Sequence, residues 1–231
     1  MESAGTDDAT RIEAGSLAGR GVVVTAGGTR EPIDPVRYLG NRSSGKMGNA
    51  LAEAAALQGA RVTLVTTVDA PDTPAIDVVH VETAEEMRAA VRRELARADL
   101  LLMAAAVADY RPVIRSPIKL KKRNEEWALP LVPTTDILTS LRAEPWRSAV
   151  LVVGFAAETD DLLPNAQRKL REKGLDLIVL NDVSRSDIGM GSDDNEVTII
   201  DSTGIVAHVA RAPKAQVAAD ILSLVAGRLP R

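Results

Sequence analysis

The sequence predicts an α/β fold in which helices cover both faces of a doubly wound, mostly parallel sheet. After residue 20, short apolar runs rich in β-branched residues alternate with helix-like segments. Such runs are typical of parallel strands that are buried on both faces. Two further runs flank Thr203-Gly204 and predict an antiparallel hairpin at a sheet edge. Together these patterns indicate a Rossmann-like sheet with an antiparallel edge hairpin.

The elements can be assigned in chain order. A capping box is the clearest helix start: Thr83 precedes Glu86 by three residues, and an apolar stripe follows. Residues 1–20 are polar and lack periodicity, so we expect a flexible leader before a single domain over 21–231. The expected helices span 45–60, 83–98, 164–173 and 213–226; the expected strands span 22–25, 61–67, 99–107, 126–132, 149–155, 175–180, 196–202 and 205–210.

Composition excludes several classes of protein. The net charge of −4 does not indicate a basic surface for nucleic acid. Aromatic residues make up only 2% of the chain, too few for a surface on which nucleic-acid bases stack. The chain has no cysteine, which excludes disulfides and thiolate chemistry. Its longest apolar runs are too short to span a bilayer, and its start lacks the apolar core of a signal peptide. We therefore expect a cytoplasmic protein that binds neither nucleic acid nor membranes.

Residues 21–48 are the most informative segment. A buried strand leads into Gly27-Gly28 and a polar loop, and a glycine-rich turn then opens an alanine-rich helix. Free N–H groups at a helix start attract anions, so Ser43, Ser44 and Gly45 are predicted to bind a phosphate or a carboxylate. An N-capped helix with a surface lysine is the plainer alternative. The dinucleotide fingerprint lacks its third glycine, and Met47 replaces the hydroxyl of a Walker A loop.

Ligands of such sheets bind beyond the carboxyl ends of the strands. The loops at 27–30, 105–122, 155–159 and 181–184 are expected to meet there. The loop at 110–123 is basic and is expected to be mobile over the site. Lys169 and Lys173 share a helix face and repel each other unless an anion lies nearby; an exposed helix face is the alternative. His80 and His208 lack the partners of a metal site or a triad, so packing or surface roles are expected.

Taken together, these segments resemble phosphopantothenate–cysteine ligase, the ligase part of a bifunctional decarboxylase–ligase family. The resemblance rests on TAGGTREPIDPVRYLGNRSSGKMG at 25–48, AAAVADYR at 104–111, KLKK at 119–122, VGFAAET at 153–159 and LIVLNDVS at 177–184, with GSDDNEVTII at 191–200. It covers essentially the whole chain after the leader, and the combination is very specific.

The resemblance implies a two-step ligation in coenzyme A biosynthesis. The carboxylate of 4′-phosphopantothenate attacks the α-phosphorus of a nucleoside triphosphate, and pyrophosphate leaves. The amine of cysteine then displaces the nucleotide and forms the amide. Because most bacterial members use cytidine, CTP is the expected co-substrate rather than ATP, with Mg²⁺ as cofactor and a homodimer as the assembly. The edge hairpin is the expected contact of that dimer.

The resemblance also implies site residues. Asn41 matches the asparagine that contacts the acyl intermediate. Lys119 matches the essential lysine that stabilises phosphate charge and also belongs to the nucleotide site. Asp109 contacts the nucleotide or its ribose, or else holds magnesium. The implied nucleotide-binding residues are Ala104, Ala105, Asp109, Lys119, Phe155, Lys169 and Lys173.

One departure from the family pattern concerns Pro133-Thr134-Thr135-Asp136, where the family often has lysine-asparagine-proline-aspartate. This change affects expected triphosphate contacts. Two alternatives to a ligase remain. One is an NAD(P)-dependent short-chain-type reductase, which needs a tyrosine four residues before a lysine, a spacing that neither Tyr38 nor Tyr110 provides. The other is a nucleotide-binding protein that has lost its activity.

Overall fold

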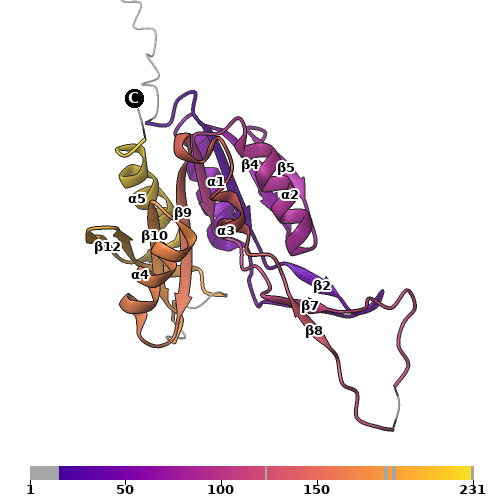
Figure 1. Ribbon diagram of the computed structural model, residues 1–231. Coiled ribbons are helices and arrows are strands. Elements are labelled where there is room, and N and C mark those ends of the chain that lie inside the picture. The colour runs from indigo at the N-terminus through magenta and orange to yellow at the C-terminus, as the bar shows by residue number, and fades with distance from the viewer. Residues whose placement is uncertain (1–15, 123, 185–186, 189–190, 230–231) are drawn as a thin grey trace, which may run out of the picture.

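A central sheet of eight strands organises the protein (Figure 1). The computed structural model describes residues 16–122, 124–184, 187–188 and 191–229. Along the sheet the strands lie in the order β12-β11-β10-β9-β6-β1-β4-β5. Their bounds are β1 Gly21–Ala26, β4 Arg61–Thr66, β5 Ile76–His80, β6 Leu100–Met103, β9 Leu151–Glu158, β10 Leu177–Asp182, β11 Asp194–Asp201 and β12 Gly204–Pro213.

The sheet is doubly wound, as the sequence predicts. The chain begins at β1 in the middle and winds outward through β4 and β5. It then returns to β6 on the other side of β1 and winds outward through β9 and β10, and all of these neighbours pair in parallel. The hairpin β11–β12 completes this edge with antiparallel pairing. The winding direction changes between β1 and β6, which is where such sheets open a crevice.

Helices cover the two faces of the sheet. Alternate residues of β1 separate the layers: Val22 and Val24 belong to the core under α1 and α5, whereas Val23 belongs to the core under α2 and α4. The predicted capping box is confirmed, because Thr83 accepts from the Glu86 N–H and the Glu86 side chain accepts in return. The helices are α1 Lys46–Leu57, α2 Ala84–Leu95, α3 Ile137–Leu141, α4 Leu162–Lys173 and α5 Lys214–Ala226.

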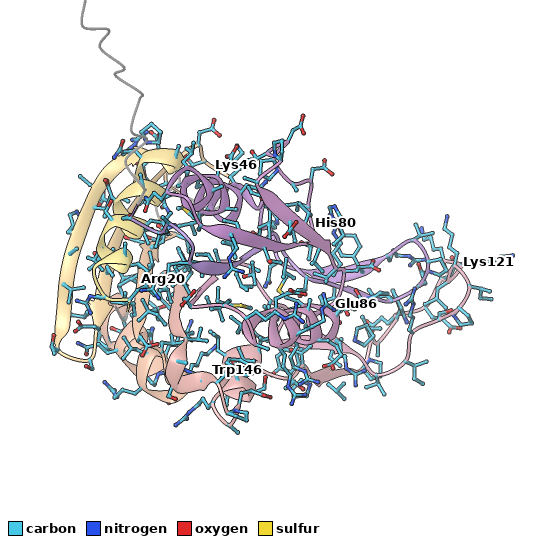
Figure 2. The ribbon with its side chains drawn as sticks, turned by 90° about the horizontal axis from the view of Figure 1, so that it is seen from above. Arg20, Lys46, His80, Glu86, Lys121 and Trp146 are labelled. Carbon is cyan, nitrogen blue, oxygen red and sulfur yellow. The ribbon has the colours of Figure 1, made fainter. Side chains whose placement is uncertain are left out.

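A long arm projects from the body of the molecule (Figure 1). It comprises residues 30–40, which contain the hairpin of β2 Arg30–Pro32 and β3 Tyr38–Gly40, together with residues 110–122 and 124–133. In the second segment, β7 Tyr110–Pro112 pairs with β8 Leu131–Pro133, and the intervening residues extend beyond this pair. Lys121 lies near the tip of the arm, well away from Lys46 on the body (Figure 2).

Three expectations need correction. The packed domain begins before residue 20, because the Leu17 side chain is fully buried against the sheet; one leucine among polar residues gives no periodic signal. Residues 126–130 do not extend β8, which starts only at Leu131. Strand β5 was not predicted, since three of its five residues are exposed and its apolar run is short. Residues 1–15 of the expected leader lie outside the described residues.

The longest helix in the described part of the chain, α5, has 13 residues, so none of the described helices could span a bilayer.

Candidate functional site

A cavity of about 380 Å³ opens at the carboxyl ends of β6, β9 and β10. Segments distant in sequence meet there, as the winding of the sheet dictates. Of the residues predicted for the site, ten line this cavity: Asn41, Ser43, Ser44, Gly45, Ala104, Ala105, Asp109, Phe155, Lys169 and Lys173. The loop at 27–30 was expected to line it as well but contributes no lining residue.

Two glycines allow the start of α1 to sit close to β1. Gly45 is the N-cap residue with φ 75°, a left-handed conformation that glycine adopts without strain. A Cβ at Gly48 would lie 2.6 Å from the Ala26 Cβ and 2.7 Å from the Thr25 carbonyl oxygen. The first turn of α1 therefore packs directly on the end of the strand. Residues 45–48 line the cavity, and the dipole of a helix favours an anion near its N-terminus.

The loop after β6 is held tightly against β1. The Ala105 N–H donates to the Thr25 hydroxyl at 3.0 Å, and the Ala108 N–H donates to the Thr29 hydroxyl at 2.8 Å. The Asn41 side chain donates to the Val107 carbonyl at 3.0 Å and so joins the two loops. This wall of the cavity is therefore fixed in place before any ligand arrives.

The two lysines of α4 have carboxylate partners in the same chain. Lys169 lies 2.6 Å from Glu158, and Lys173 lies 2.7 Å from Asp136. Burial opposes ionisation of Asp136, but hydrogen bonds from Lys173 and the Thr139 N–H lower its pKa below the ordinary value. The repulsion between the two lysines is thus relieved without a ligand, so their spacing alone does not require a bound triphosphate.

Lys119 differs from the other predicted site residues, because it lies in the arm and does not line the cavity. Its neighbour Leu120 is held at both backbone groups: the N–H donates to Asp34 at 3.1 Å, and the carbonyl accepts from Arg37. Asp34 also accepts from the N–H groups of Val36 and Arg37. These bonds lower the pKa of Asp34 against the opposing effect of burial. Lys119 is therefore positioned relative to the β2–β3 hairpin rather than to the cavity.

Several lining residues escaped the sequence analysis. Thr134 donates through its hydroxyl to the Ala108 carbonyl at 2.6 Å, and its N–H donates to the Asp109 carbonyl at 2.9 Å. The segment that departs from the family pattern is thus part of the wall. Asn181 brings a buried amide oxygen that has no hydrogen-bond partner in the described part of the chain. Lys46 lines the cavity beside the predicted phosphate pocket, and Thr135 and Asp136 line it within the segment that departs from the family pattern. Asn195 and Lys214 line it without having been predicted as site residues.

No group of three or more histidine, cysteine, aspartate or glutamate side chains that could hold a metal occurs among the residues described. Asp109 is the carboxylate predicted to hold magnesium. Mg²⁺ commonly takes one or two protein carboxylates together with substrate phosphates and water. The donor set therefore fits an ion brought in by a nucleotide and does not fit a cage made by protein alone.

Comparison with protein families matches residues 17–229 to the DNA/pantothenate metabolism flavoprotein C-terminal domain. The chain belongs to this family. The coenzyme A biosynthesis bifunctional protein CoaBC of Bacillus subtilis (strain 168) is 42% identical over 212 residues, 91% of this chain and 52% of that protein. A protein of an unknown prokaryotic organism, named cysteine/cysteine sulfinic acid decarboxylase, is 44% identical over 208 residues, 89% of this chain and 58% of that protein.

The chain thus spans about half the length of the curated relatives it matches. A crystal structure of the C-terminal domain of CoaBC is 37% identical, has a TM-score of 0.76, and is matched over 92% of this chain and 97% of that one. The DNA/pantothenate metabolism flavoprotein of Streptococcus pneumoniae has a TM-score of 0.77 at 21% identity, over 90% and 99% of the two chains, and supports the fold alone.

Proposed function

We propose that this protein is a phosphopantothenate–cysteine ligase of coenzyme A biosynthesis. One observation carries the proposal: residues from five separate segments, each matched to the ligase family, line a single cavity. The names of the bifunctional relatives agree with this pathway. A reductase is not favoured, because neither tyrosine of the chain lines the cavity and the family match points elsewhere.

In the first proposed step, a carboxylate oxygen of 4′-phosphopantothenate bonds to the α-phosphorus of CTP. The bond from that phosphorus to the bridging oxygen breaks, and pyrophosphate leaves. In the second step the cysteine amine attacks the acyl carbon, loses a proton and releases CMP. The nucleotide serves as leaving group, since a free carboxylate is a poor acyl donor. Magnesium would accompany the triphosphate and neutralise its charge, with Asp109 as protein ligand.

The cavity residues have distinct roles in this proposal. Asn41 is fixed by its bond to Val107 and presents its amide beside the reacting acyl group. Ser43, Ser44 and Gly45 bind a phosphate group at the start of α1. Phe155 and the α4 lysines contact the nucleotide, and the unpartnered oxygen of Asn181 accepts from one of its donor groups.

Lys119 requires a further condition, because it lies in the arm and does not line the cavity of its own chain. The arm must either fold back or lie over the cavity of a second copy. A homodimer, which the resemblance implies, would meet this condition. The arm exposes the apolar side chains that such a contact would cover, including Ile114 at 78% and Ile118 at 72% exposure.

The test is an assay with three readouts on the same protein: pyrophosphate release, formation of phosphopantothenoylcysteine, and release of carbon dioxide. A ligase releases up to one equivalent of pyrophosphate from CTP and phosphopantothenate alone, continues to release it only when cysteine is also present, and yields the amide. Carbon dioxide release from cysteine or from phosphopantothenoylcysteine, without pyrophosphate, would instead assign a decarboxylase. Nucleotide binding with none of the three products would assign a protein that has lost its activity.

A further inference from the structure

Two lysines that the predicted reaction does not use lie together at the α1–α5 side of the cavity. Lys46 is the first residue of α1 and Lys214 is the first residue of α5, and both line the cavity. These helices cover one face of the sheet, whereas the α4 lysines approach the cavity from the other face. Lys214 is only 6% exposed, which is exceptional for a lysine. The cavity therefore has two separate cationic sides.

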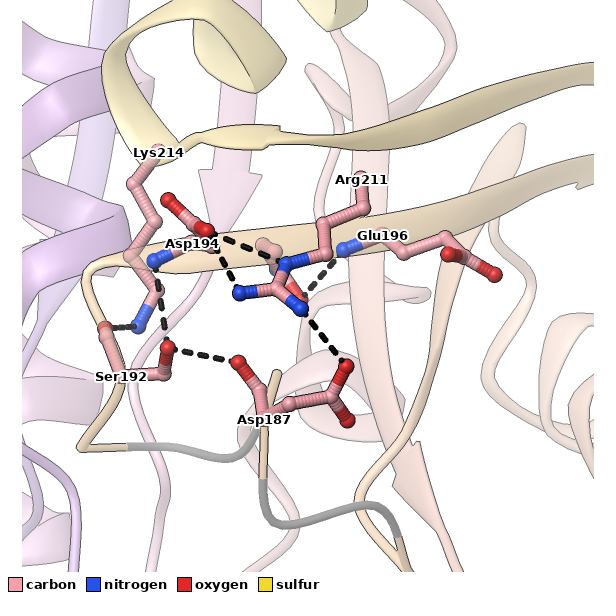
Figure 3. A network of polar contacts seen from close by, with 7 residues as sticks. Asp187, Ser192, Asp194, Glu196, Arg211 and Lys214 are labelled. Carbon is pink, nitrogen blue, oxygen red and sulfur yellow. Dashed lines mark hydrogen bonds and ion pairs between the residues drawn. The ribbon is translucent and has the colours of Figure 1, made fainter.

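Both ammonium groups contact the short segment Gly191–Asp194. The Lys46 Nζ lies 2.6 Å from a carboxylate oxygen of Asp193 and 3.1 Å from the Gly191 carbonyl. The Lys214 Nζ donates to the Ser192 carbonyl, as Figure 3 shows. The Lys214 backbone N–H donates to the Asp193 carbonyl at 2.9 Å. This segment thus bridges the starts of the two helices.

The two aspartates of this segment differ in how firmly they are held. Asp194 accepts twice from Arg211, at 2.9 and 3.1 Å, and Arg211 also bonds Asp187, which anchors the segment (Figure 3). Asp193 bonds only Lys46 through its side chain among the contacts described, and that side chain is 89% exposed. A carboxylate in water gives up a single ion pair at little cost. Asp193 is therefore the replaceable anion.

The charges support the same conclusion. Burial lowers the pKa of Lys214, and the nearby charge of Lys46 lowers it further, against the opposing effect of Asp193 and Asp194. The hydrogen bond from Lys46 lowers the pKa of Asp193. Two ammonium groups close enough to disfavour each other gain from an anion with more charge than one carboxylate. A phosphate group carries that charge and offers three acceptor oxygens.

We propose that Lys46 and Lys214 form a subsite for a phosphate group, and that the Asp193 carboxylate pairs with the Lys46 ammonium group until the phosphate displaces it. The chemistry of the ligand follows from these contacts alone, while its identity rests on the proposed function. The phosphate belongs either to phosphopantothenate or to the nucleotide. Ser43 and Ser44, just before Lys46 in the chain, supply hydroxyl donors on the same wall.

Calorimetric titration tests this subsite with two matched ligand pairs: phosphopantothenate against pantothenate, and CTP against cytidine. Lys46→Gln and Lys214→Gln should each weaken binding of a phosphorylated ligand about tenfold or more, and leave its unphosphorylated partner unchanged. The pair that responds identifies the source of the phosphate. Asp193→Asn should strengthen binding of the same ligand about threefold to tenfold, because the competing carboxylate is gone.

Glu53→Gln is the control, because it removes one negative charge from an exposed position further along α1. It should leave every affinity unchanged. Lys214→Gln removes a buried contact, so its folded state is checked by circular dichroism; Lys46 is half exposed and its variant addresses the subsite independently.

Unchanged affinity for both phosphorylated ligands in Lys46→Gln would overturn the inference, as would weaker binding in Asp193→Asn. These titrations need no turnover. A chain that fails as a ligase but binds phosphate through both lysines would therefore refute only the proposed function. An active ligase whose affinity for both phosphorylated ligands stays the same in Lys46→Gln and Lys214→Gln would refute only the subsite.

Discussion

The central sheet and the arm differ in how far their apolar side chains are buried. The central strands are covered on both faces, and Leu64, Leu100 and Leu102 have no exposed surface. The arm instead presents Ile118 and Trp127 largely to solvent. Predicted site residues occur in both regions. The predicted binding groups thus lie on a preformed crevice, whereas Lys119, the cation expected at the reacting phosphate, lies on a projecting arm.

The two segments of the arm are nevertheless held to each other by specific contacts. Asp34 and Arg37 hold the two backbone groups of Leu120, and the Arg37 guanidinium lies 5.6 Å from the centre of the Trp127 ring. Few apolar contacts secure it beyond these bonds. Regions with this character have low local stability even where the protein as a whole is stable.

The largest expected effect tests the difference in burial between the sheet and the arm. Leu102→Ala should lower the free energy of unfolding by about 2–5 kcal/mol, because it leaves a cavity in the middle of the sheet. Ile118→Ala should change it by less than about 0.5 kcal/mol, because that side chain is 72% exposed. Urea denaturation of both variants provides the measurement. A comparable loss in the two would mean that the arm is packed in solution.

The next effect is on activity. Lys119→Ala should slow pyrophosphate release about 10²- to 10³-fold, since a developing phosphate charge loses a donor. Urea denaturation should show unchanged stability. Arg115→Ala, another exposed cation of the arm, is the matched control and should retain its rate. An unaltered rate in Lys119→Ala would remove this lysine from the mechanism.

Mixing variants distinguishes the two ways in which the arm can reach a cavity. Asn41→Asp places a negative charge beside the anionic intermediate and should impair turnover without unfolding the protein. When Asn41→Asp and Lys119→Ala are mixed and allowed to exchange subunits, part of the activity should return if the arm serves a second copy. No recovery after verified exchange would show that the arm acts on its own chain.

A smaller effect concerns the contact between the two segments of the arm. Asp34→Asn should speed hydrogen exchange at the Leu120 amide, because the N–H loses an ionised acceptor. Exchange at Leu102 in the sheet should stay slow. Both amides are followed in one mass-spectrometric or NMR experiment. Equal acceleration at the two sites would contradict the separation of arm and sheet.

The smallest effect concerns Asp201, which closes the turn of the edge hairpin between β11 and β12. The Thr203 hydroxyl, the Arg228 guanidinium and the Thr203 N–H lower the pKa of Asp201 to about 2. A lowered pKa stabilises the fold above the ordinary value of 3.8, and that contribution disappears as the pH falls through about 2. Asp201→Asn should therefore lose less than about 1 kcal/mol near pH 6 and only a small part of that at pH 2. Unfolding measured at both pH values checks this.

Sequence reasoning was strongest where a local pattern fixes the structure. The apolar runs placed most strands of the sheet, and Thr83 with Glu86 fixed the start of α2. The glycine-rich turn at Gly45 correctly indicated a helix start at a cavity wall. These features depend on backbone geometry and burial, which neighbouring residues determine.

The sequence pattern did not predict features that depend on contacts between segments distant in the chain. Lys214 belongs to the cavity only because α5 packs beside α1, and nothing near residue 214 indicates this. Leu17 is buried by the body of the fold rather than by its neighbours in sequence. Lys119 lies outside the cavity because it belongs to the projecting arm. A sequence motif can indicate that a lysine takes part in a reaction, but it does not show whether that lysine reaches the cavity of its own chain or of a second copy.

The buried Leu17 also determines where the polypeptide can be tethered. Its N–H bonds the Gln58 carbonyl beyond the last turn of α1, at the opposite end of that helix from Lys46. Helix α5 likewise runs from Lys214 at the cavity to Ala226, and it lies on the side of the molecule remote from the arm (Figure 1). A reporter or a surface linker attached just before Leu17 or just after Leu229 would therefore leave the mouth of the crevice clear.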